Sequence, residues 1–175
     1  MANDLHEWHE FYLLLGSAAA ALLALLFVAV SVGVGFVTER NQDNTRTYMS
    51  PIVVHFAAVL FLSAVALAPV KSAGFTVIVI ALAGLAGFGV SAFTTIRSFV
   101  HGGSLVTRFD RFAYGVIPDL AYLGIIASAV LIATGWHWSL EILAGALLLL
   151  LLINIRNAWD LILTVVRQLS RRGRR

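Results

Sequence analysis

Hydrophobic and polar positions alternate in long blocks along this 175-residue chain. Five apolar stretches of roughly 20 residues or more follow one another, and about 20 apolar residues make a helix long enough to cross a bilayer. The pattern therefore predicts an all-α, polytopic transmembrane bundle of five helices in a single domain. The expected spans cover residues 11–37, 51–70, 74–96, 112–135 and 139–166, and a basic C-terminal tail follows at 167–175.

Local signals predict where the first two spans begin. Trp8, Phe11 and Tyr12 are expected in the aromatic belt at a membrane interface, at the start of the first span. Ser50 is a good N-cap, and Pro51 suits a first helical position because the N–H that it lacks is not needed there. Residues 38–50 are then expected to form a polar loop.

Composition narrows the class of protein. The chain is 60% hydrophobic and 12% charged, whereas a soluble domain has about a quarter of its residues charged. It contains no cysteine, which excludes disulfides, thiolate metal sites and cysteine nucleophiles. No serine-hydrolase elbow, zinc-protease helix motif or phosphate-binding glycine loop is present in the sequence, so we expect neither an enzyme nor a bound cofactor.

The basic residues predict an orientation. With five spans, the arginines of the polar segments all fall on one side of the membrane and only Lys71 falls on the other. The positive-inside rule then places the N-terminus outside and the C-terminus in the cytoplasm. Six of these arginines are expected to contact anionic lipid headgroups: Arg108, Arg111, Arg171, Arg172, Arg174 and Arg175.

Polar residues inside the spans are the main candidates for a functional site. In the run LLLLLLINIRNAWDL the last span changes from apolar to polar, and Arg156 and Asp160 are four residues apart, so they can pair along the helix. Asp119 lies within the fourth span, and its expected partner is Arg156 or His55. The candidate intramembrane cluster consists of His55, Asp119, Asn154, Arg156, Asn157 and Asp160. It is either a site for an ion, proton or substrate or a set of hydrogen bonds that joins helices.

Two other patterns bear on binding and packing. His6, Glu7, His9 and Glu10 are metal-ligating residue types, but their spacing fits a solvated turn better than a metal site, so no metal is expected. In the third span, Ala83, Gly87 and Ser91 form a ladder of small residues, which favours close helix packing within the protomer or between protomers.

Four segments carry a resemblance to a known family: HEWHEFYLLLGSAAAALLALLFVAVSVG, RTYMSPIVVHF, DRFAYGVIPDLAY and LLLLLLINIRNAWDL. Together they cover most of the chain, which resembles a family of small bacterial integral membrane proteins. Some members are labelled modulators of the membrane protease FtsH. The resemblance implies a multi-pass protein of the bacterial inner (cytoplasmic) membrane, and it implies no active-site residues.

Two functional hypotheses follow. The first is a non-enzymatic accessory or modulator protein that docks on a membrane-protein partner or on copies of itself, as the small-residue faces and the basic amphipathic tail suggest. The second is an oligomeric channel or a carrier of protons or ions that uses the polar cluster. Neither hypothesis involves nucleic acid.

Overall fold

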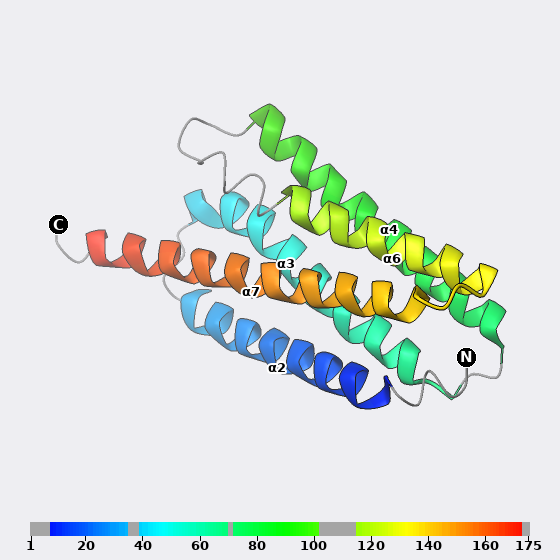
Figure 1. Ribbon diagram of the computed structural model, residues 1–175. Coiled ribbons are helices and arrows are strands. Elements are labelled where there is room, and N and C mark those ends of the chain that lie inside the picture. Colours follow the sequence, from blue (N-terminus) through cyan, green and yellow to red (C-terminus); the bar gives the residue numbers. More distant parts are fainter. Residues whose placement is uncertain (1–7, 35–38, 70–71, 102–114, 173–175) are drawn as a thin grey trace.

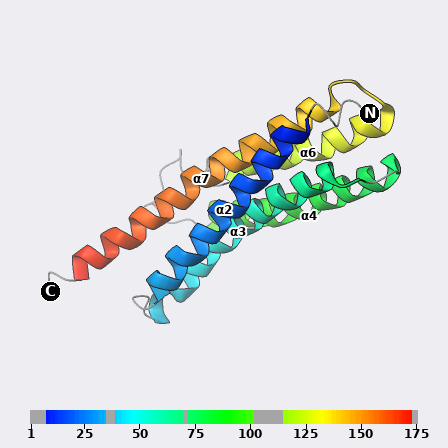
Figure 2. The same ribbon diagram turned by 90° about the horizontal axis from the view of Figure 1, so that it is seen from below.

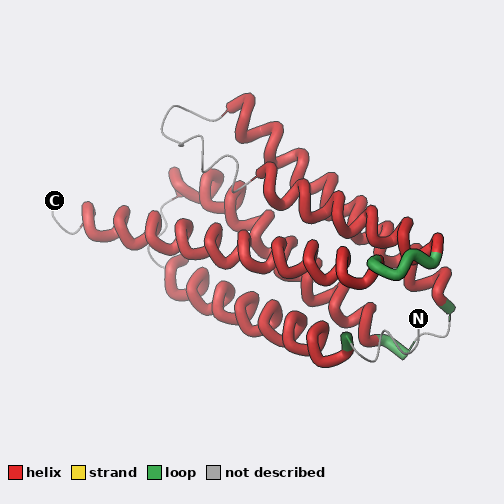
Figure 3. Tube along the Cα trace, viewed as in Figure 1, coloured by secondary structure: helices red, strands yellow, loops and turns green. Residues whose placement is uncertain are grey.

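The computed structural model describes residues 8–34, 39–69, 72–101 and 115–172, and over these residues it is an all-helical bundle without strands. Its helices lie alongside one another in an elongated arrangement (Figures 1 and 3). Each helix packs against the next in the chain, and α7 returns to contact α2 and α3. The helices are α2 (His9–Val34), α3 (Glu39–Leu67), α4 (Ala73–His101), α6 (Ile117–Thr134) and α7 (Ser139–Arg172).

Four of these helices are long and apolar enough to cross a membrane, over residues His9–Ala29, Gly74–Arg97, Ile117–Thr134 and Ser139–Asp160. The fifth helix, α3, has a shorter apolar segment at Pro51–Leu67. Large apolar side chains also cover the outside of the bundle, for example Leu14, Leu82 and Trp159, each of which is at least 60% exposed. Such a surface suits hydrocarbon and not water. The predicted all-α membrane bundle of five helices is confirmed.

The predicted start of the second span is wrong. Helix α3 begins at Glu39 and contains Pro51 in its interior, so Ser50 is not an N-cap and residues 39–50 are helical. The reason is cooperativity: extending an existing helix by one residue costs far less than starting a new one. Proline removes only one backbone hydrogen bond from a helix that tertiary packing supports.

Helix α7 is longer than its apolar part. It begins at Ser139, as predicted, passes the end of the apolar segment at Asp160 and continues to Arg172. Its C-terminal part projects past the other helices in both views of the bundle (Figures 1 and 2). The part of the predicted tail between residues 167 and 172 is therefore helical.

A tight turn joins α6 to α7. Gly135 adopts the left-handed conformation with a φ of 73°, its N–H donates to the Ile132 carbonyl at 3.2 Å, and the Trp136 N–H donates to the Leu131 carbonyl at 2.9 Å. This left-handed cap ends a helix at little cost because glycine has no Cβ. The short turn makes α6 and α7 antiparallel neighbours.

Tyr12 does not face the lipid–water interface, where it was expected to belong to an aromatic belt. Its side chain is fully buried, and its hydroxyl donates to the Leu140 carbonyl at 3.1 Å. The bond ties the start of α2 to the start of α7. A tyrosine hydroxyl that is buried in an apolar bundle needs a partner, and a carbonyl in the first turn of a helix provides one.

Candidate functional site

The polar side chains inside the bundle fall into separate groups, which come from α3, α4, α6 and α7. The first group is a buried pair formed by His55 of α3 and Tyr122 of α6. The His55 Nδ1 atom lies 2.8 Å from the Tyr122 hydroxyl, and the two side chains are 1% and 0% exposed. This hydrogen bond joins two helices that are not consecutive in the chain.

Gly87 of α4 sets the position of the Tyr122 ring. A Cβ atom added to Gly87 would lie 2.0 Å from Cε1 and 2.4 Å from Cζ of this ring, which is far inside van der Waals contact. Only glycine therefore lets the ring lie this close to the backbone of α4 while its hydroxyl reaches His55. The predicted close packing at this position of the third span is confirmed, and the contact is within the protomer.

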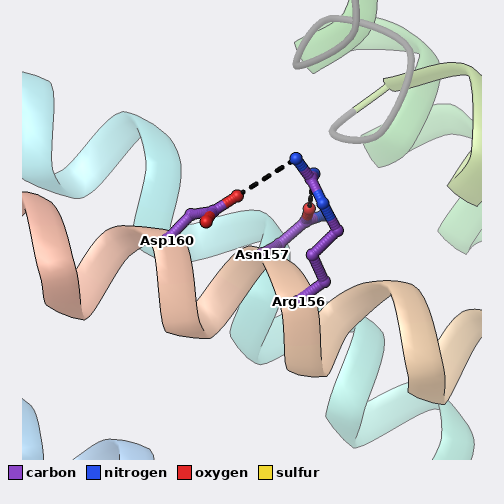
Figure 4. Close-up of polar contacts among 3 residues, drawn as sticks. All are labelled: Arg156, Asn157 and Asp160. Carbon is purple, nitrogen blue, oxygen red and sulfur yellow. Dashed lines mark hydrogen bonds and ion pairs between the residues drawn. The ribbon is translucent and has the colours of Figure 1, made fainter.

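The second group lies on one face of α7 (Figure 4). The Arg156 Nη2 atom lies 3.3 Å from Oδ2 of Asp160, and Arg156 Nη1 donates to Oδ1 of Asn157 at 3.5 Å. The predicted pairing of Arg156 with Asp160 is therefore confirmed. The two charged side chains are 33% and 37% exposed, which places the ion pair at the edge of the bundle, while Asn157 is buried.

Asn154 is the most buried member of the predicted cluster. It is 0% exposed, and neither its amide nitrogen nor its amide oxygen has a hydrogen-bond partner among the described residues. An unpaired buried amide is costly, so such a group commonly meets a water molecule or a ligand.

Asp119 lies apart from the residues that were expected to meet it. It stands in the first turn of α6, and its Oδ1 atom is buried without a hydrogen-bond partner in the described part of the chain. The expected pairing with Arg156 or His55 is wrong, since Arg156 pairs with Asp160 and His55 bonds Tyr122. The position along α6 explains the absence of a contact with His55: Asp119 lies about one helical turn before Tyr122, and Tyr122 is the residue at the level of His55.

Several candidates lie outside the described residues or carry no described side chain. Arg108, Arg111, Arg174 and Arg175 lie outside the described ranges, as do His6 and Glu7. Arg171 and Arg172 belong to the last turn of α7, and their side chains are not described. Contact of these arginines with lipid headgroups stays a prediction. Within residues 8–34, 39–69, 72–101 and 115–172, no group of three or more His, Cys, Asp or Glu side chains is placed to hold a metal ion.

Sequence reasoning missed several buried hydroxyl side chains, among them Tyr12, Tyr122 and Ser91. These three side chains are all 0% exposed. From the sequence, Tyr12 was expected at a membrane interface and Ser91 in a ladder of small packing residues. The available signal was chemical: a hydroxyl within an apolar span is unfavourable against hydrocarbon, so it is expected to turn toward the inside of the bundle.

The fold and this site define a multi-pass, helical-bundle membrane protein with polar groups buried between its helices. Comparison with protein-family models, with curated proteins and with solved structures finds no match. The function is therefore argued from the geometry of the chain itself.

Proposed function

We propose that this chain is a non-enzymatic accessory or modulator protein of a bacterial inner membrane, and that the C-terminal part of α7 is the segment by which it docks on another membrane protein. The orientation that fits the basic residues has the N-terminus outside and the C-terminus in the cytoplasm. The docking segment then lies on the cytoplasmic side.

The length of α7 is the observation that carries this proposal. The apolar segment ends at Asp160, but the helix continues to Arg172 and projects past the other helices (Figure 2). On a helical wheel its sequence separates an apolar stripe from a polar stripe that includes Arg167 and Arg171. A helical segment that has two such faces and projects past the other described helices is suited to a groove in a partner.

Site-specific photo-crosslinking in intact membranes tests the proposal. A photoreactive residue at Ile162, which is exposed at the base of the projecting segment, should capture a defined membrane protein, with the protease FtsH as one partner to examine by mass spectrometry. The same residue at Leu148, which is exposed in the middle of the apolar segment, serves as the matched control. Capture of lipid alone from Ile162, with monomers alone in mild detergent, would contradict the docking role.

A second function is supported by the buried polar groups. Asn154 and Asp119 carry buried atoms without partners among the described residues, and His55 and Tyr122 form a buried hydrogen bond between two helices. Such groups are typical of carriers and channels for protons or ions. A bundle of this size would require an oligomer to enclose a pore.

Flux measurements in proteoliposomes test this second function. Proton or Na⁺ flux should fall on Asp119→Asn and on Asp160→Asn, while Ser63→Ala, at another buried hydroxyl without a partner, should leave it unchanged. Flux that equals that of empty liposomes, or that both Asp variants leave unaltered, removes the carrier hypothesis.

A further inference from the structure

Three close contacts establish how α4 and α6 face each other. Gly84 lies against Ile126, Gly87 lies against Tyr122, and Thr95 lies against Gly115, just before α6. The contacts advance along α4 as they retreat along α6, so the two helices are antiparallel. Between the contacts at Gly87 and at Thr95, one further position of α4 is expected to lie opposite one further position of α6.

Ser91 and Asp119 occupy that pair of positions. Ser91 is four residues from both Gly87 and Thr95, and Asp119 is three residues from Tyr122 and four from Gly115. Residues three and four apart share a helix face. Ser91 and Asp119 therefore face each other at one level of the α4–α6 contact, between two glycines that bring the helices close together.

Both residues carry a buried oxygen that lacks a partner. Ser91 is 0% exposed, and its Oγ has no hydrogen bond among the described residues. The Oδ1 atom of Asp119 is likewise buried and has no hydrogen-bond partner among these residues. The hydroxyls of Thr94 and Thr95 donate to the Ser91 carbonyl at 2.7 and 3.0 Å, so their protons are occupied and their lone pairs remain. Of these two hydroxyls, that of Thr95 lies at the Gly115 contact, so its oxygen can act as an acceptor beside Ser91 and Asp119.

Arg97 is the only arginine or lysine in the sequence of α4, and it lies over an aromatic ring. The guanidinium carbon of Arg97 lies 5.6 Å from the centroid of the Phe93 ring, and both of these side chains are exposed. Within the described part of the chain, no ion pair compensates the Asp119 carboxylate. A carboxylate in a membrane bundle needs a counter-charge or a proton.

We propose that Ser91 and Asp119 form a binding site for a small monovalent cation of the size of Na⁺. One carboxylate balances one positive charge, and carboxylate, hydroxyl and carbonyl oxygens are the hard ligands that such ions prefer. A divalent ion would call for more carboxylates than this contact provides.

Binding of Na⁺ by Ser91 and Asp119 does not require that the protein transports Na⁺. Na⁺ that binds without any flux would leave the site standing and remove the carrier function. A wild-type chain that carries protons or Na⁺ but shows no saturable Na⁺ binding would remove the site and leave the carrier function standing.

The experiment uses the full chain in nanodiscs that are free of Na⁺, with choline chloride holding the ionic strength constant. Thermal unfolding is followed by the fluorescence of the four tryptophans. A ligand that binds only the folded state raises the unfolding temperature in a saturable manner. We therefore expect NaCl, and not choline chloride, to raise the unfolding temperature of the wild-type chain.

Variants assign the effect to the two residues. Ser91→Ala and Asp119→Asn should shift the Na⁺ midpoint upward by about tenfold to a hundredfold or abolish the response. Ser63→Ala is the matched control, because Ser63 is also 0% exposed with an unpartnered Oγ but lies on α3, and it should keep the wild-type midpoint. Direct binding of radioactive Na⁺ gives a second measurement that does not depend on stability.

Three results would overturn the proposal. The first is a wild-type chain that neither binds radioactive Na⁺ nor responds to NaCl. The second is a Na⁺ response that Asp119→Asn leaves intact. The third is an unfolding temperature that depends on pH through Asp119 while remaining indifferent to Na⁺, which would show that the carboxyl holds a proton instead.

Discussion

The contact between Gly87 and Tyr122 predicts a large effect from a single methyl group. In Gly87→Ala the new Cβ would lie 2.0 Å from Cε1 of the ring, whereas carbon atoms in contact are about 3.5–4.0 Å apart. The ring must then move by roughly 1.5 Å, which is the difference between these distances. That displacement pulls the hydroxyl away from His55, which it meets at 2.8 Å.

The expected magnitude combines three terms. Overpacking a core costs about 1–3 kcal/mol. Loss of a side-chain hydrogen bond within a membrane bundle adds about 0.6 kcal/mol and at most about 1.7 kcal/mol. Alanine regains about 1 kcal/mol over glycine in a helix. The net free energy of unfolding should therefore fall by about 1–3 kcal/mol.

The assay compares Gly87→Ala with Gly89→Ala in the same detergent or nanodisc, by tryptophan fluorescence during unfolding. Gly89 is exposed on the same helix, and an added Cβ there meets nothing within 4 Å, so its substitution should be neutral or slightly stabilising. A Tyr122→Leu background should remove most of the penalty of Gly87→Ala, because the two residues are in direct contact. Equal stabilities for Gly87→Ala and Gly89→Ala, or a penalty that persists without the ring, would refute the reasoning.

Three further substitutions separate the polar groups. Tyr122→Phe should lower stability by about 1 kcal/mol, because it leaves His55 buried without its partner, and a double-mutant cycle with His55→Phe should return that coupling energy. Asn154→Leu should leave stability unchanged or raise it by up to about 2 kcal/mol, since no described hydrogen bond is lost; a clear drop in unfolding temperature would reveal a partner for this amide. Asp160→Asn should cost less than about 1 kcal/mol, because the pair with Arg156 is about one-third exposed, and its small effect should vanish in high salt.

Sequence patterns were reliable for features that are settled within one helix. The apolar stretches predicted the helices, the small residues of the third span predicted a close contact at Gly87, and the four-residue spacing predicted the pair of Arg156 and Asp160. Each of these depends on the length or the periodicity of a single segment. The misplaced start of α3 shows the limit of local signals, because a serine and a proline in a helix-starting pattern were overridden by the continuity of the helix.

The sequence by itself therefore determined that this is an all-helical membrane bundle, because the cost of exposing backbone groups to hydrocarbon leaves a long apolar segment no alternative to a helix. Only the tertiary structure decided which polar groups meet. The rotation and register of each helix place Tyr122 against Gly87 of α4 and within hydrogen-bond distance of His55, although charge alone favoured a meeting of Asp119 with Arg156 or His55. Rotation and register follow from the packing of small and large side chains across helices that are distant in the chain, and no local pattern encodes them.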